Sequence, residues 1–279
     1  MGYDFLNRLS SVGDYAGIGY TVSDGIDTIT YGNDVNTTYT YDNRDRHTNI
    51  LTQNSGGVLL NLTYGYDLSG SVTSINNGSY TETYGYDLLD RLNSTAGPWG
   101  TVSYGYDAVG NRLSKAVQGG STISYSYANV DRMLTATGLG FDWDPNGNMI
   151  YKHDGAYAWN YTYDTLNRLT KVHKDDVLSA LYTYDAGGRR VRGWDTVDGT
   201  TDYVYSGLII IDEVSGGTHE RHIYAGGMHI ASNTSGSVEF YHVDHLGSTR
   251  LKTVAIASAI YQSNYEPFGP SKGDIFLGY

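Results

Sequence analysis

The stretch Tyr-Gly-Tyr-Asp-Ala-Val-Gly-Asn-Arg-Leu at residues 104–113 decides the fold of this chain. Two aromatic residues separated by one position lie on the same face of a β-strand, because side chains alternate with a period of two. Asp107 and Gly110-Asn111 are turn formers, since Asx side chains bond the local backbone and Gly accepts a positive φ. Arg112 and Leu113 then open a returning strand. The stretch therefore predicts one β-hairpin.

The same pattern recurs along most of the chain, with an aromatic pair, an Asp, a short turn and Arg-Leu in the fuller copies. Weaker copies open the chain at Tyr3-Asp4 and at Tyr39-Thr40-Tyr41-Asp42. Regular spacing of this kind is the signature of a repeat architecture, here about ten to twelve hairpins. The second aromatic falls every 16 to 21 residues, at Tyr66, Tyr86, Tyr106, Tyr127, Trp143, Tyr163, Tyr184, Tyr205 and Tyr224.

These repeats predict an all-β fold in which stacked hairpins form a curved, spiralling β-sheet strip. A single hairpin cannot bury its apolar face, whereas neighbouring hairpins can pack their Tyr rings against one another and leave the hydroxyls at a wet edge. The repeated Arg is expected to stack on a Tyr of the next turn or to pair with the repeated Asp. A β-propeller is the alternative fold, because two hairpins would make one blade. It predicts an alternation every second repeat, which the sequence does not show.

Composition excludes several classes of function. The chain has 279 residues, 28 Tyr, 4 Pro, no Cys and a formal net charge of −12. Without Cys it can form no disulfide and no Cys-ligated metal site. The acidic balance argues against a nucleic-acid partner, which needs a basic face. The longest apolar runs are far shorter than the ~20 residues of a membrane span.

A second motif follows the repeats, and together the two resemble a known family. The Tyr-Asp repeat is similar to the YD repeats of the Rhs family, which also occur in the C component of Tc toxins and in teneurins. The sequence from Phe240 to Arg250 resembles the start of the Rhs-associated core. The matching residues are Tyr241, His242, Asp244, His245, Leu246, Gly247, Ser248, Thr249 and Arg250, followed by Pro267, Phe268 and Gly269.

This resemblance implies a YD strip over residues 1–235 and the incomplete start of an Rhs-associated core over 236–279. In the family such strips wind into hollow shells that enclose a C-terminal toxin or effector, and the core plugs one end. Complete members often cut themselves at an Asp-Pro-x-Gly element beyond a Phe-x-Gly-Tyr-like stretch. This chain reaches that stretch at Phe276 to Tyr279, so the sequence is expected to stop before the cleavage element and the toxin. Accordingly, we expect no enzyme, no catalytic residue and no cofactor.

Three functions are therefore considered. The first is a structural shell segment that encapsulates or presents a C-terminal toxin or effector in competition between cells. The second is a cell-surface adhesin whose Tyr and Trp rows bind carbohydrate or a partner, and the third is the remnant of an autoproteolytic core. An open strip has two unpaired edges, so edge-to-edge self-association is also expected. The chain is expected to be secreted or displayed at the cell surface, with any export signal outside it. Weak support for export comes from N-glycosylation sequons, Asn-x-Ser/Thr, at Asn36, Asn61, Asn77, Asn93, Asn160 and Asn233.

Two segments carry residue types that bind metals, although the repeat explains both. Asp142, Asp144 and Asn146 match the first half of a calcium loop. His153 occupies the position where an EF-hand has a bidentate Glu, and the segment is in register with the repeat turns. In the second segment, His242 and Asp244 would share one face of a strand while His245 points away. We favour a structural role for both segments, with Asp244 and Arg250 as internal partners.

Overall fold

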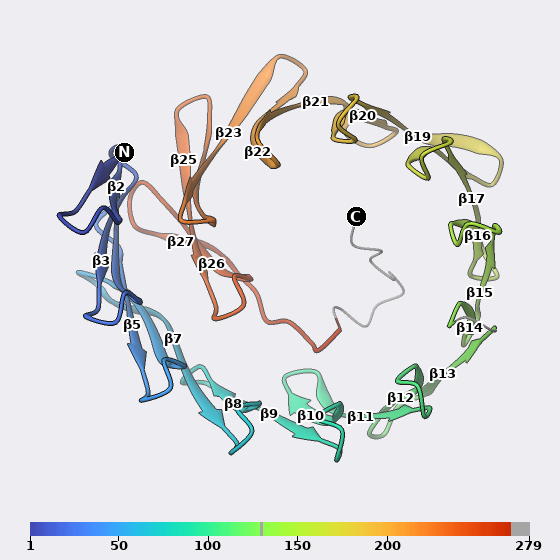
Figure 1. Ribbon diagram of the computed structural model, residues 1–279, viewed down its shortest axis with the longest axis horizontal. Coiled ribbons are helices and arrows are strands. Elements are labelled where there is room, and N and C mark those ends of the chain that lie inside the picture. Colours follow the sequence, from blue (N-terminus) through green and yellow to red (C-terminus); the bar gives the residue numbers. More distant parts are fainter. Residues whose placement is uncertain (129–130, 269–279) are drawn as a thin grey trace. The chain divides into compact units, whose positions relative to one another are not determined.

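The computed structural model describes residues 1–128 and 131–268, and these contain β-strands but no helix (Figure 1). None of the described residues therefore belongs to a helix that could cross a membrane. The strands are β1 (Gly2–Tyr3), β2 (Leu9–Val12), β3 (Ala16–Tyr20), β4 (Ile26–Tyr31), β5 (Asn36–Tyr41), β6 (His47–Asn54), β7 (Gly57–Tyr66), β8 (Val72–Asn76), β9 (Thr81–Tyr86), β10 (Leu92–Gly97), β11 (Gly100–Tyr106), β12 (Arg112–Val117), β13 (Thr122–Tyr127), β14 (Met133–Ala136), β15 (Leu139–Trp143), β16 (Met149–His153), β17 (Ala158–Tyr163), β18 (Leu169–Lys174), β19 (Val177–Tyr184), β20 (Arg190–Asp195), β21 (Gly199–Ser206), β22 (Ile209–Ser215), β23 (Thr218–Ala225), β24 (Met228–Thr234), β25 (Ser237–Val243), β26 (Thr249–Val254) and β27 (Ala259–Gln262).

Successive strands pair antiparallel, as the hairpin repeat predicts. β5 pairs with β6, β6 with β7, and β7 with β8, and the described strands belong to one 27-stranded sheet. No four-stranded blades are set apart in this part of the chain, so the β-propeller alternative is wrong. The all-β fold of consecutive hairpins is confirmed.

Each repeat turn contains a bulge, which places the second aromatic at an irregular position of the ladder. In the turn from β5 to β6, the Asp45 amide donates to the Asp42 carbonyl over 3.0 Å, and Asp42 donates to Arg46 over 2.9 Å. Asp45 has a φ of 56°. This is a tight turn followed by a left-handed residue, a combination that shifts the register by one residue. The shift falls between Thr40 and Tyr41.

The chain divides into two compact units. The first joins Met1–Thr101 to the residues from Arg221 onward, and the second comprises Val102–Glu220. In the second unit many strand residues are only half-buried. This grouping follows packing and not sequence motifs, so the proposed boundary between residues 235 and 236 stays a prediction.

The first unit has a two-layered core because its C-terminal strands lie on its N-terminal strands. Ile29 and Ile50 from β4 and β6 are 1% and 0% exposed, and they belong to the same cluster as Ala231 and Leu251 from β24 and β26. Figure 1 shows β25 and β26 in orange and red beside the blue N-terminal strands. The Tyr31 hydroxyl donates to the Tyr241 carbonyl over 3.0 Å, 210 residues away in sequence. We call this packing of β24–β26 on β4–β7 the dock, and it holds the C-terminal motif in place.

Candidate functional site at the docked C-terminal motif

The Asp of each repeat turn organises its own turn. In one example, Asp42 Oδ1 accepts hydrogen bonds from the Arg44 and Arg46 amides at 2.8 and 3.1 Å, and Oδ2 accepts one from Arg46 Nε at 2.8 Å. The Arg46 side-chain bond is the main reason why the pKa of Asp42 is lowered to about 2. A lowered carboxyl pKa stabilises the fold above the unfolded value of 3.8, and this contribution is lost as the pH falls toward 2.

The turn Arg also reaches the next hairpin. The Arg46 guanidinium lies 4.3 Å from the centre of the Tyr66 ring, while its Nη2 stays 2.6 Å from Asp42. Arg168 and Tyr184 repeat the contact at 4.9 Å. The Arg therefore pairs with its own Asp and stacks on the next Tyr at the same time, which confirms both of the expected contacts.

The second aromatic of each repeat forms a hydrogen bond back to the preceding hairpin. Its polar group donates to the carbonyl five positions after the turn Asp, or after the residue that replaces this Asp, at distances of 2.7 to 2.9 Å. The hydroxyl was expected at a wet edge, but it instead satisfies a carbonyl next to the bulge. The pairs are Tyr20 with Leu9, Tyr41 with Ile26, Tyr66 with His47, Tyr86 with Val72, Tyr127 with Arg112, Trp143 with Met133, Tyr163 with Met149, Tyr184 with Leu169, and Tyr205 with Arg190.

Removing one of these hydroxyls should weaken the link between two hairpins. The Tyr184→Phe variant is expected to lose about 1 kcal/mol of unfolding free energy, because the bond from Tyr184 to Leu169 at 2.7 Å is lost while the ring remains. Urea unfolding followed by circular dichroism measures the loss. Tyr157→Phe is the matched control, since Tyr157 is 48% exposed in the same unit. Equal stabilities of the two variants would contradict a structural role for the hydroxyl.

The C-terminal motif is itself a copy of the repeat turn. Asp244 Oδ1 accepts hydrogen bonds from the Leu246 and Ser248 amides, each at 3.0 Å. Gly247 has a φ of 83°, and the Tyr265 hydroxyl donates to the Thr249 carbonyl over 2.8 Å. The register shift between His242 and Val243 ends the strand alternation, so Asp244 belongs to the turn and not to the face of His242. The motif therefore follows the same structural rules as the strip.

A buried polar cluster holds His242 against the N-terminal strands. The side chains of His242, Thr37, Thr52 and Thr253 are 0% exposed. His242 Nε2 lies 2.9 Å from Thr253 Oγ1, and Nδ1 lies 3.5 Å from Thr37 Oγ1, which is 2.8 Å from Thr52 Oγ1. The Tyr31 ring packs edge-on against the imidazole at 4.4 Å. These contacts give His242 a structural role in the dock.

A charged cluster lies beside it. Arg250 is 4% exposed, and its guanidinium lies 3.0 Å from Asp244 Oδ2 and 3.6 Å from Glu82 Oε2. Burial opposes the charge of Arg250, but the Glu82 and Asp244 carboxylates outweigh burial and raise the pKa of Arg250. The Tyr84 hydroxyl donates to Glu82 over 2.5 Å. Burial and this hydrogen bond raise the pKa of Tyr84 far above its usual value.

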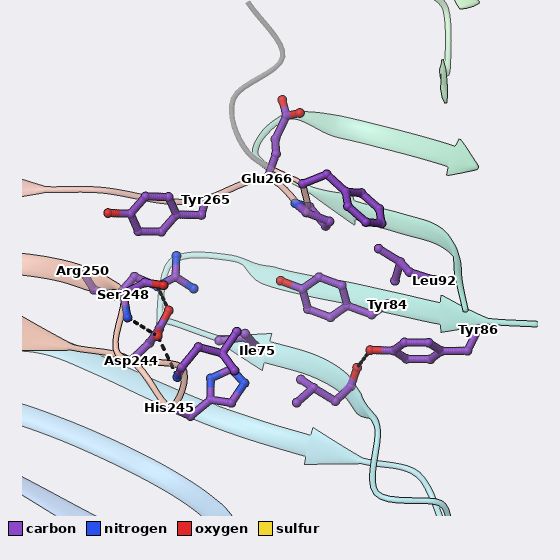
Figure 2. Close-up of a pocket in the computed structure, with 14 residues that line it drawn as sticks. Ile75, Tyr84, Tyr86, Leu92, Asp244, His245, Ser248, Arg250, Tyr265 and Glu266 are labelled. Carbon is purple, nitrogen blue, oxygen red and sulfur yellow. Dashed lines mark hydrogen bonds and ion pairs between the residues drawn. The ribbon is translucent and has the colours of Figure 1, made fainter. Parts of the chain in front are cut away.

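This cluster borders a pocket of about 560 Å³ in the first unit. Figure 2 shows Ile75, Tyr84 and Tyr86 on the strip side of the pocket, with Arg250 and Tyr265 on the side of the C-terminal segment. Pro267 and Phe268 also line it, whereas Gly269 lies outside the described residues. The pocket is mainly apolar, and Asp244 and Arg250 at its edge are paired with each other.

Sequence reasoning missed Glu82, although a signal was present. Glu82 lies two residues before Tyr84 and four before Tyr86, so strand alternation places it on the aromatic face. A charged residue on a buried face needs a partner, and Glu82 is 2% exposed. The expected partnership of Asp244 with Arg250 is present. The third member of this charged cluster is Glu82, which lies 162 positions before Asp244 in the sequence.

The calcium-like segment is an ordinary repeat turn in its hydrogen bonding. Asp144 Oδ1 and Oδ2 each accept a bond of 2.8 Å, from the Asn148 amide and from Asn148 Nδ2. Asn146 Nδ2 lies 3.1 Å from Asn167 Oδ1, and Asp142 is on strand β15. Within residues 1–128 and 131–268, no group of three His, Asp or Glu side chains is arranged to hold a metal ion.

A strip of hairpins linked by Tyr and Arg, with a docked motif that copies the repeat, defines a YD-repeat protein. The sequence profile of the teneurin YD-shell family matches residues 6–270, and the chain belongs to this family. The chain is 34% identical over 120 residues to the double-stranded DNA deaminase toxin A of Burkholderia cenocepacia. That match covers 38% of this chain and 8% of the toxin.

Solved structures show the same fold. The Photorhabdus luminescens Tc holotoxin pore matches with a TM-score of 0.76 at 20% identity, covering 91% of this chain and 15% of that chain. The crystal structure of TcdB2–TccC3 matches with a TM-score of 0.69 at 17% identity, covering 96% of this chain and 17% of that chain. The chain therefore spans a small part of the proteins that it resembles.

Proposed function

We propose that this chain is a wall segment of an exported YD shell that encloses or presents a C-terminal toxin or effector. The observation that carries the proposal is the double link between hairpins, from Arg to the next Tyr ring and from the Tyr hydroxyl back to the preceding hairpin. Such links join successive hairpins into a continuous wall. The family, the Tc toxin folds and the toxin relative support this function.

A purely structural role is also supported by the docked motif. Asp244 and Glu82 are the buried carboxylates beside the pocket, and Arg250 contacts both of them. These acids are thus engaged in holding the C-terminal segment on the strip. Nor does the repeat favour carbohydrate binding, because the stacked rings of Tyr66 and Tyr184 are covered by Arg on one face.

Protease protection tests the enclosure. Where the reading frame continues past residue 279, the downstream polypeptide would be produced within the full gene product and on its own, and each sample treated with a nonspecific protease. The proposal predicts that the downstream polypeptide survives much longer within the full gene product, whose shell includes this segment. Equal rates of digestion would contradict enclosure, and the double link between hairpins would still stand as a structural feature.

Edge-to-edge association of the isolated chain is a further hypothesis from the open ends of the strip. Strand β27 is exposed at all 4 of its residues, including Ile260 and Tyr261 at 50% and 41%. An exposed strand of this kind can pair with another chain. Light scattering is expected to show a molar mass that rises with protein concentration, and a constant monomer mass would exclude pairing.

A further inference from the structure

Three histidines of the C-terminal strands lie in or beside the dock on the N-terminal strands. His242 is wholly buried on β25, His229 is on β24, and His245 follows β25 in the motif turn. His47 on β6 faces His245 from the N-terminal side. A histidine placed where water is excluded resists protonation, because burial disfavours its charged form.

Among residues 1–128 and 131–268, no charged group compensates a proton on His242. The side chains that face it are Tyr31 from β4, Thr37 from β5, Thr52 from β6 through Thr37, and Thr253 from β26. All of them are neutral at pH 7. Burial alone lowers the pKa of His242 to about 3.

His245 and His47 lie close to each other across the dock. The Tyr64 ring packs on His245 at 4.6 Å, and the Tyr39 and Tyr41 rings pack on His47 at 5.7 and 4.6 Å. Burial lowers the pKa of both histidines. Asp244 favours a proton on His245, but Arg250 opposes it, and His245 disfavours a charge on His47. The buried Nδ1 atoms of His47 and His245 have no hydrogen-bond partner among the residues that the structure describes.

His229 is surrounded by aromatic rings and lies near Lys252. Its ring lies 4.9 Å from Tyr224 on β23, 4.0 Å from Tyr241 on β25 and 5.1 Å from His222. Burial, followed by His222 and Lys252, lowers the pKa of His229 to about 4. Lys252 on β26 is itself paired with Glu239 at 3.1 Å. A proton on His229 would therefore add a positive charge near Lys252.

From this arrangement we infer that β24–β26 are a pH-operated latch, docked on β4–β7 while the enclosed histidines are neutral and released when they take up protons. The inference rests on the dock alone and not on the proposed shell function. For a base with a lowered folded pKa, the released state binds more protons below the unfolded value of 6.5. Stability of the dock is thus lost as the pH falls from 6.5, whereas the turn carboxylates act only below about pH 4.

The size of the pH effect on the dock follows from the lowered pKa values of His242 and His229. At pH 5, proton uptake by His242 shifts the equilibrium between the docked and the released state toward release by about 30-fold, and proton uptake by His229 does so by a similar factor. The shift is this large because an exposed histidine is mostly protonated at pH 5. The two factors multiply when both side chains are exposed by release. At pH 7 each factor is close to one.

Hydrogen exchange of the full chain tests the latch. Protection of the β25 and β26 amides, corrected for intrinsic exchange rates, is expected to fall at least about 20-fold between pH 7 and pH 5. Strands β17–β20 of the other unit serve as the internal reference and should change less than about 3-fold. Unchanged protection of β25 and β26, or an equal loss in β17–β20, would overturn the inference.

His242→Asn separates the latch from general acid sensitivity. The variant cannot titrate at this position, so the loss of β25 protection between pH 7 and pH 5 should shrink by about 20-fold. His219→Asn is the control, because the His219 side chain is 51% exposed in the other unit. If the His242→Asn variant is unfolded, NMR titration of the wild-type imidazoles decides instead. A His242 ring that titrates near 6.5 while β25 stays protected would contradict the latch.

Discussion

Replacing Arg250 by Met is expected to destabilise the unit that contains the dock by about 3–5 kcal/mol. Arg250 is the cation between two buried carboxylates, at 3.0 Å from Asp244 and 3.6 Å from Glu82. Without it, Glu82 and Asp244 are left buried at 2% and 7% exposure with no opposite charge. The loss is measured by urea unfolding, followed by hydrogen exchange of β25 and β26.

Two further variants assign that loss to charge. Arg192→Met removes a salt bridge to Asp202 in which the Arg192 side chain is 58% exposed, and it is expected to cost less than about 1 kcal/mol. Adding Glu82→Gln to Arg250→Met removes one of the unpaired carboxylates and should recover part of the stability. A loss for Arg250→Met no larger than that for Arg192→Met would contradict the buried ion cluster.

The second large effect is expected from Leu251→Ala. Leu251 is 1% exposed on β26 and belongs to the core cluster shared with Ile29 and Ile50. Truncating it leaves a cavity between the two layers, and comparable substitutions cost about 2–5 kcal/mol. Leu113→Ala, at 42% exposure on β12, should cost less than about 1 kcal/mol. Similar unfolding free energies for the two variants would show that β26 is not part of a core.

Local sequence patterns predict the hairpins but not the dock. The Tyr-x-Tyr-Asp spacing predicts strands and turns because alternation and turn chemistry act over a few residues. The packing of β25 and β26 on β4–β7 joins residues about 200 positions apart, such as Asn33 and Val254 with a 2.8 Å hydrogen bond. No periodicity within either segment encodes that partnership. The boundary between residues 235 and 236 comes from the resemblance to the Rhs-associated core, and it stays a prediction.

The Tyr hydroxyl shows a different limit of sequence reasoning. A pattern identifies an amphipathic ring but not the carbonyl that its hydroxyl meets, because that carbonyl is freed by the bulge in the preceding hairpin. Trp143 shows that this position needs a hydrogen-bond donor on its aromatic side chain. Its Nε1 donates to the Met133 carbonyl over 2.7 Å, where other repeats use a Tyr hydroxyl. An aromatic with a polar donor is what this position needs. A Phe at the position would keep the ring and lose the link.

The docking of residues from Arg221 onward on residues 1–101 is tested most directly by a chemical cross-link. The chain has no native Cys, so two introduced thiols are unambiguous. Asn54 Nδ2 donates to the Ala257 carbonyl over 3.0 Å, which places Asn54→Cys and Ala257→Cys within reach of a short bis-maleimide. The structure predicts an intramolecular cross-link in the double variant at neutral pH and none in either single variant. A double variant that stays uncross-linked, or that links only between chains, would contradict the dock.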